Sequence, residues 1–475
     1  YAMGNLSRLY DQGLGTAVDP EEAVRWAVAA VERGDPGKTT ELKEQPANFS
    51  ANFRREFQSV LRDRGYFSGN VDGEFGADTI AAIDSLAAGK PAETTPSVNA
   101  GQTSNGDDSN AGPSDDQATI ASTSIGDAIT FRANARSETA EARQCYTMAA
   151  EPGARAGESG VVFADIKVRD AIDLCTRAVE KDPADSMLHD MLGRAYDMDR
   201  SYDQARKSYQ KAVDLGNSHA YTNMAWLAIY GNGEPQDMAK GMRMMEKAAN
   251  AGNSYAQASL GWIYREGYGG MTRDYKLAFA WYMKAALQDY PNAQASVGWL
   301  YREGLGVERD YAKSLDFYRK GAANGDLNAM GSLGYALQNG LGTDVDYQQA
   351  RQWYEKGVER NDAYSMSALA WLYREAKGVD QNYGMALDLY KRAADLGDVT
   401  GMSSLGYMNQ YGLGTPVNYN EALRWYEMAA AKNDAYSFAS LGWMYREGVG
   451  VARNYDKSLD YYRKGADLGD LNAIG

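Results

Sequence analysis

Residues 296–326 read SVGWLYREGLGVERDYAKSLDFYRKGAANGD and contain a pattern that the rest of the chain repeats. Altered copies of its opening return along the chain: SLGWIYREG begins at Ser259, ALAWLYREA at Ala368 and SLGWMYREG at Ser440. A Leu-Gly pair or a close substitute marks each copy, and the pairs begin at residues 192, 224, 260, 297, 333, 369, 405 and 441. Most spacings are therefore 36 residues. A fixed period of this size is typical of a solenoid of stacked units.

Each copy predicts two helices. In the quoted copy, Ala293, Val297 and Tyr301 follow one another at helical spacing, and the Gly of the pair lets a neighbouring helix approach closely. Asp310 suits the N-cap of a second helix, and Gly325 suits its left-handed end. Neither apolar stripe can be buried within one copy. The predicted fold class is therefore all-α, an α-solenoid of stacked antiparallel helix pairs.

These residues resemble two related repeat families. Leu-Gly-x-x-Tyr followed by Ala-x-x-x-Tyr is similar to the tetratricopeptide repeat, and LGRAYDMDRSYDQARKSY from Leu192 matches it with a short turn. The later copies carry a longer turn of the REGLGVERDY type and resemble Sel1-like repeats, the 36-residue relatives of that family. The resemblance covers residues 164–475 and, as an isolated and divergent copy, residues 1–36.

A second period of 72 residues lies within the first. Residues 353–375 and 425–447 share 13 of 23 residues, whereas 353–375 and 389–411 share only 5. Duplication of a pair of units explains this period. The period would also arise if two kinds of unit face different neighbours or ligands. The two explanations do not exclude each other.

The resemblance also implies a binding groove. In tetratricopeptide arrays, the residue after Leu-Gly and the residue one turn later face the concave side. Carried over, these positions are Trp262, Arg265, Trp299, Arg302, Tyr335, Gln338, Trp371, Arg374, Tyr407, Gln410, Trp443 and Arg446. Aromatic residues and Arg often dominate binding energy at protein interfaces, which favours a partner groove. The alternative is structural: the Trp row packs between units, and each Arg-Glu pair forms ion pairs from unit to unit.

A different motif begins at Phe57 with FQSVLRDRGYFSGNVDGEFGADTIAAI. Its closely spaced glycines, with an Asp before one of them, indicate tight turns between two helices. The motif resembles the peptidoglycan-binding module of cell-wall hydrolases through Gly65, Tyr66, Gly69, Asp72, Gly73, Gly76 and Thr79. It departs from that family at Phe57 and at the close of the last helix. The resemblance implies wall binding, and a purely structural module is the alternative.

These patterns divide the chain into six parts. We expect an isolated Sel1-like repeat at 1–36, the wall-binding-like module at 50–88, a disordered linker at 89–118, a partly helical lead-in at 119–163, a tetratricopeptide-like first unit at 164–216 and a Sel1-like solenoid at 217–475. The linker contains no aromatic residue over 91–118, so it cannot bury enough apolar surface to fold. The chain opens at Tyr1 and stops within a copy of the repeat, so we expect a piece of a longer protein.

The chain has two cysteines, Cys145 and Cys175, both in segments that read as helices. Two buried free thiols or one disulfide would satisfy the sequence, and we favour the disulfide, which would staple the first helix of the solenoid. Together with the wall-like motif, a disulfide favours an oxidising compartment, the bacterial periplasm or cell envelope, over the cytoplasm.

Composition and motif content narrow the classes of ligand and activity that we expect for this chain. A net charge of −15 disfavours nucleic acid, and no apolar run is long enough for a membrane span. We recognise no catalytic motif, metal-ligand spacing or cofactor fingerprint, so we expect no enzyme activity in this chain. The sequence predicts an envelope scaffold that binds a protein partner in its groove, with peptidoglycan as a second possible ligand. The alternative is the accessory region of a larger cell-wall hydrolase or peptidase.

Overall fold

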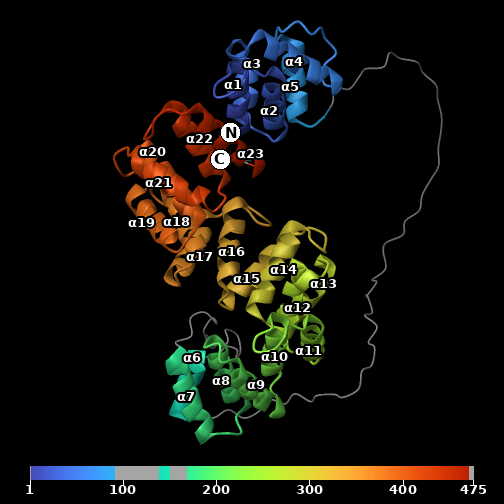
Figure 1. Cartoon of the computed structure of the whole chain (residues 1–475), viewed down its shortest axis with the longest axis vertical. Helices are drawn as coiled ribbons and strands as arrows, with labels where there is room; N and C mark the ends of the chain where they lie inside the picture. The colour runs from blue at the N-terminus through green and yellow to red at the C-terminus, as the bar shows by residue number, and fades with distance from the viewer. Residues whose placement is uncertain (1, 91–138, 150–167, 470–475) are drawn as a thin grey trace, which may run out of the picture. The chain divides into compact units, whose positions relative to one another are not determined.

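The computed structural model describes residues 2–90, 139–149 and 168–469. All of its regular elements within these ranges are helices, and Figure 1 labels them along the chain. Their bounds are α1 (Ala2–Gln12), α2 (Pro20–Glu32), α3 (Pro36–Glu44), η1 (Pro46–Asn48), α4 (Ala51–Asp63), α5 (Ala77–Ala87), α6 (Ala140–Ala149), α7 (Val168–Lys181), α8 (Ser186–Met198), α9 (Tyr202–Asp214), α10 (Ser218–Tyr230), α11 (Met238–Asn250), α12 (Ser254–Glu266), η3 (Tyr268–Gly270), α13 (Tyr275–Ala286), α14 (Pro291–Glu303), α15 (Tyr311–Ala323), α16 (Leu327–Asn339), α17 (Tyr347–Glu359), α18 (Ala363–Glu375), α19 (Tyr383–Asp395), α20 (Val399–Tyr411), α21 (Tyr419–Ala430), α22 (Ala435–Glu447) and α23 (Tyr455–Asp467). Residues 91–118 of the linker predicted at 89–118, and residues 119–138 and 150–163 of the predicted lead-in, lie outside the described residues.

Helix pairs are set by residues that recur at each boundary. Asp310 caps α15 by accepting a hydrogen bond from the Lys313 amide, as the sequence predicts. The preceding helix, α14, ends at Gly304, whose φ of 69° is in the left-handed region that favours glycine. This Sel1-like unit is therefore a first helix, a glycine-rich turn and a capped second helix, whereas the unit of α8 and α9 has a short turn without glycine and no side-chain cap on α9.

Within a unit, a tyrosine ring of the second helix packs on the Gly of the Leu-Gly pair. A Cβ atom on Gly298 would lie 2.7 Å from the Tyr318 ring, and one on Gly334 would lie 2.4 Å from Tyr354. Both tyrosines are almost fully buried. The absent side chain is thus what lets the two helices approach, which confirms the role predicted for this glycine.

The chain forms two compact units, residues 119–365 and residues 1–118 with 366–475. In the first, helices α6 to α17 follow one another as stacked pairs, and Cys145 on α6 is joined to Cys175 on α7 by a disulfide. Both cysteines are fully buried. The predicted disulfide is present, and it ties α6 to α7, the first two helices of this compact unit among the described residues.

The other compact unit joins the two ends of the chain. Its α1 packs against α23, and Figure 1 shows the N-terminal helices beside the last helix of the chain. One apolar core runs through this region and includes Leu6 of α1, Phe57 of α4, Ile83 of α5 and Tyr462 of α23. The N-terminal repeat copy and the wall-binding-like module are thus separate segments of sequence that share a core with the last repeat.

No helix in the described ranges combines the length and the apolar character that crossing a membrane requires.

Candidate functional site

The row of residues carried over from the tetratricopeptide groove lies along the first helices of the units. Most of its side chains are partly exposed, and Tyr335 is the most open, with 38% of its surface accessible. Arg374 and Gln410 are buried instead, with 3% and 7% accessible. Repeat position alone therefore does not make these residues available to a partner.

Three of the four arginines of this row contact the aromatic residue of the following unit. The Arg265 guanidinium lies 5.6 Å from the Trp299 ring centroid, and Arg302 lies 5.7 Å from Tyr335. Arg374 lies 5.1 Å from Tyr407. These distances are in the range of cation–π interactions. The row thus joins one unit to the next as well as lining a surface.

The Arg-Glu pairs have a different role from the one that the sequence suggested. Arg265 and Glu266 form an ion pair of 2.7 Å, and Arg302 and Glu303 one of 2.6 Å, between adjacent residues of one helix. Arg374 and Arg446 pair with the next residue in the same way. The interpretation as ion pairs between units was wrong, because each glutamate is reached by its own neighbour in the helix.

The 72-residue period corresponds to two kinds of contact beneath the row. In the units with glutamine, the Tyr354 hydroxyl donates to the Gln338 side chain at 3.1 Å, and Tyr426 donates to Gln410 at 2.9 Å. In the units with arginine, the equivalent tyrosine faces a guanidinium: burial raises the pKa of Tyr390, and the nearby Arg374 partly offsets this effect. The two kinds of unit therefore differ in the charge that they place in the row.

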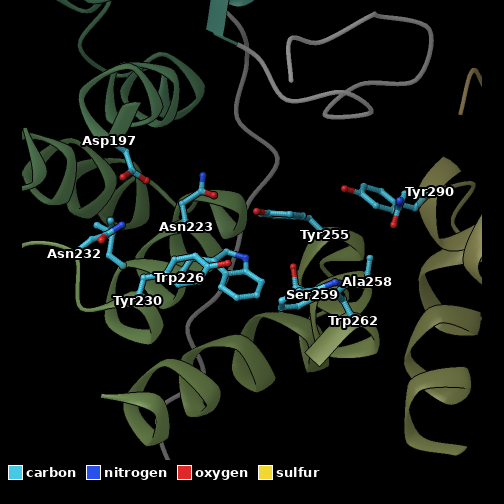
Figure 2. Close-up of a pocket in the computed structure, with 12 residues that line it drawn as sticks. Asp197, Asn223, Trp226, Tyr230, Asn232, Tyr255, Ala258, Ser259, Trp262 and Tyr290 are labelled. Atoms are coloured by element: carbon cyan, nitrogen blue, oxygen red, sulfur yellow. The ribbon is translucent and has the colours of Figure 1, made fainter. Parts of the chain in front are cut away.

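A cavity of about 420 Å³ opens at the first helices α8, α10, α12 and α14. Figure 2 shows aromatic rings and polar side chains around it. Its lining is Asp197, Asn223, Trp226, Leu227, Tyr230, Asn232, Tyr255, Ala258, Ser259, Trp262, Tyr290 and Asn292. Five of these residues are aromatic and five are polar. Clefts of this size that combine apolar rings with polar groups are typical of binding sites.

The aromatic part of the cavity is held by ring contacts. The Trp226 ring lies 5.2 Å from Tyr230 and 5.8 Å from Trp262, measured between centroids. Trp262 in turn lies 5.1 Å from Tyr268. Such pairs fix ring orientation, so the cavity wall is preformed rather than assembled by a ligand.

Sequence reasoning named only Trp262 among the residues of this cavity. Trp226 occupies the same repeat position, since it follows the Met224-Ala225 pair that replaces Leu-Gly. The unit alignment therefore contained the signal for Trp226. Tyr255 and Tyr290 lie at the starts of α12 and α14, outside the groove positions, and no sequence pattern pointed to them.

Asp197 is the one ionisable carboxyl group of this lining. Burial raises its pKa from 3.8 to about 6, against the attraction of the Arg194 guanidinium and the Tyr209 hydroxyl. The cavity therefore becomes more negative as pH rises through 6, which makes it sensitive to pH near neutrality.

The wall-binding-like motif is organised by one buried side chain, Gln58. Its amide donates to the Asp72 carboxylate at 3.1 Å, and to the Thr79 hydroxyl at 3.1 Å. Its oxygen accepts from the Gly73 amide at 2.6 Å. Hydrogen bonds from the Glu74 amide and, to a smaller extent, from Gln58 lower the pKa of Asp72. These motif residues thus hold the loop between α4 and α5.

The glycines of the motif also have structural roles. Gly65 and Gly73 have φ values of 77° and 84°, and a Cβ on Gly69 would lie 2.6 Å from the Phe67 ring. Gly76 is the N-cap residue of α5, and Tyr66 packs on the shared core.

Comparison with known proteins places these features in a family. The model of the Sel1 repeat matches nine segments, at residues 1–35, 191–217, 218–253, 254–290, 291–326, 327–362, 363–398, 399–434 and 439–470. A search of curated proteins finds no match.

Two solved structures share 30% identity with the chain. One is c5321, described as a protective antigen of uropathogenic Escherichia coli strains displaying an SLR fold, with 56% of each chain covered and a TM-score of 0.47. The chain thus spans little more than half of that relative. The other is a Sel1 repeat protein from Oxalobacter formigenes, with 51% of this chain and 96% of that chain covered and a TM-score of 0.47. With nine matched segments over more than half of its length, the chain belongs to the Sel1 repeat family.

Proposed function

We propose that this Sel1 solenoid is a non-catalytic scaffold that binds a segment of a protein partner along its row of first helices. The observation that carries the proposal is the aromatic cavity at α8 to α14. The cavity supplies a preformed place for one large side chain of the partner, and the row beyond it offers further contacts.

The composition of the site supports a protein ligand. Trp and Tyr are enriched where proteins bind partners, because they bury a large area and lose little conformational freedom. Tyr230 lines the cavity while 48% of its surface is exposed, and Tyr335 extends the row with 38% exposed. These rings can gain contacts without any rearrangement of the solenoid.

A peptide-display selection on the immobilised full chain tests this proposal. We expect selected peptides to bind the Tyr230→Ala variant at least about tenfold more weakly, a loss of about 1.4 kcal/mol. The matched control is Leu287→Ala, because Leu287 is 75% exposed and lies outside the cavity. Peptides that bind both variants equally well would show that the cavity is not the site.

We further propose that the scaffold works in the bacterial cell envelope. Support comes from the Cys145–Cys175 disulfide and from the resemblance of residues 50–88 to wall-binding modules. Thiol titration of unreduced native protein tests the compartment: absence of free thiols supports an oxidising environment, and two free thiols would contradict it.

Peptidoglycan is the proposed ligand of the module. We expect intact sacculi to retain the full chain, and Tyr66→Ala to reduce retention, since Tyr66 is a motif residue outside the Gln58 network. Unchanged retention of Tyr230→Ala is the control. If sacculi do not retain the unmutated chain, the module does not bind peptidoglycan and has only a structural role.

The alternative function is the accessory region of a larger cell-wall hydrolase or peptidase. The same module resemblance favours it, because such modules accompany catalytic domains in that family. Reading the gene on both sides of this sequence distinguishes the two functions, since only the alternative requires a catalytic domain there.

A further inference from the structure

The aromatic cavity lies where the repeat lacks an arginine. Further along the row, arginines pack on the aromatic residue of the next unit, as Arg265 does on Trp299 at 5.6 Å. In α10 the position equivalent to Arg265 is Ile229, three residues after Trp226, and Ile229 is fully buried. The unit before Trp262 therefore cannot supply the guanidinium that Trp299 receives.

One unit earlier, the same repeat position carries the opposite charge. Asp197 stands at the position of Arg265, five residues after the leucine of its own Leu-Gly pair. The equivalent positions in the other units are Ile229, Arg265, Arg302, Gln338, Arg374, Gln410 and Arg446. Asp197 is the only acidic residue of this series. The cavity thus combines two indole rings, Trp226 and Trp262, with a carboxyl group at a position where four other units place a guanidinium.

The lining of the cavity favours a cation. Its twelve described residues include one carboxyl group and no Lys, Arg or His. The faces of Trp and Tyr rings carry negative potential, so a cation above them is attracted. In the view of Figure 2, Asp197 and Asn223 both lie above the Trp226 ring. The Asn223 side chain donates to the buried Asp190 carboxylate at 3.0 Å, which leaves its amide oxygen as an acceptor.

The chain's own cation beside Asp197 does not fill this place. Burial raises the pKa of Asp197 to about 6, against the attraction of the Arg194 guanidinium and the Tyr209 hydroxyl. Arg194 precedes Asp197 by three residues in α8, is only 2% exposed and is not part of the lining. A carboxyl group that burial still destabilises in its charged form gains from a further cation on its cavity side.

We propose that the cavity receives an arginine side chain of the partner segment, packed on the Trp226 and Trp262 rings and facing the Asp197 carboxylate. The planar guanidinium stacks on aromatic rings and donates paired hydrogen bonds to a carboxylate, which matches this lining. The inference rests on the function proposed above, because the arginine belongs to the segment that the row of first helices binds. The partner thereby supplies the guanidinium that the repeat omits at positions 197 and 229.

The isolated side chain tests the site without any partner. Acetyl-arginine amide is added to the full chain, isotope-labelled at its nine tryptophans, at pH 8, where the Asp197 carboxyl is ionised. Trp226→Phe and Trp262→Phe assign the two indole N–H signals of the cavity in NMR spectra. We expect these two signals to shift saturably. The citrulline analogue, which has the same shape without the charge, should need an at least about tenfold higher concentration. Equal shifts with both compounds, or none with either, would overturn the proposal.

Asp197→Asn removes the charge of the carboxyl group and keeps the size of the side chain. We expect this variant to bind acetyl-arginine amide at least about tenfold more weakly and the citrulline analogue as before. The matched control is Asp199→Asn, which removes the same charge at an exposed position outside the lining. An equal loss in both variants would assign the attraction to the net charge of the chain and overturn the proposal. Denaturant unfolding at the same pH verifies that both variants are folded.

The peptides selected on the full chain separate this inference from the function on which it rests. We expect the peptides that depend on Tyr230 to contain an arginine, and citrulline in its place to weaken their binding at least about tenfold. Peptides that depend on Tyr230 but tolerate citrulline would overturn the arginine inference and leave the partner site standing. If acetyl-arginine amide shifts Trp226 and Trp262 but no peptide depends on Tyr230, the cavity binds a free cation. The proposed function and the partner's arginine would then both be wrong.

Discussion

At the scale of single residues, one repeat position can hold side chains in very different surroundings. The Arg374 side chain is 2% exposed beside Tyr407, whereas the Arg302 side chain is 24% exposed beside Tyr335. We expect Arg374→Ala to lower the free energy of unfolding by about 2–3 kcal/mol and Arg302→Ala by about 1 kcal/mol, because a buried stem loses more packing. Urea unfolding of both variants measures the difference. Equal losses would contradict this account of the row.

Asp197 supplies a prediction about pH. Its pKa is about 6 in the folded protein, and its ordinary value of 3.8 applies to the unfolded chain. The folded protein therefore holds this proton more tightly than the unfolded chain does. The contribution of Asp197 to stability is complete below pH 4 and is lost as pH rises through 6. Asp197→Asn should therefore raise the free energy of unfolding by about 1–3 kcal/mol at pH 8 and leave it unchanged at pH 3.5. Denaturant unfolding at the two pH values checks this, and the same gain at both would assign the effect to something other than ionisation.

At the scale of the helix pair, two glycines have nearly the same backbone conformation but are required for different reasons. One is required only for its left-handed backbone, and the other also because a side chain would collide with the previous unit. Gly304 and Gly342 have φ values of 69° and 76°, but a Cβ on Gly342 would lie 2.3 Å from the Tyr311 carbonyl oxygen of the previous unit. We expect Gly304→Ala to destabilise by about 1 kcal/mol and Gly342→Ala by about 3 kcal/mol, since the second change adds a collision to the left-handed strain. Thermal unfolding compares them. A loss at Gly342 no larger than at Gly304 would mean that the units separate at little cost.

At the scale of the whole molecule, the periodicity of the sequence predicted the features that recur in every repeat. The helix pairs and their stacking could be predicted from three features: the 36-residue spacing, the cap at Asp310 and the glycine beside Tyr318. The cavity was largely missed, because Tyr255 and Tyr290 reach it from helix starts that the groove pattern does not include. The contact of Gly15 with Tyr455 was missed for another reason. Each of these residues fits the repeat pattern of its own copy, and the sequence around neither of them shows that the two copies are neighbours.

The shared core of the N-terminal repeat, the module and α23 leads to a prediction for the cooperativity of the molecule. Phe57 is fully buried in that core, so Phe57→Ala should lower the free energy of opening by about 3–4 kcal/mol. Because stability in a stacked array passes between neighbours through their interfaces, amide hydrogen exchange should accelerate in α4, α1 and α23 together. Leu300→Ala in α14 is the matched control, since Leu300 is fully buried in a core of the other compact unit, and it should accelerate exchange around α14. If Phe57→Ala weakens protection in α4 while α23 keeps its own, the module folds independently, and the core seen here does not hold the two ends of the chain together.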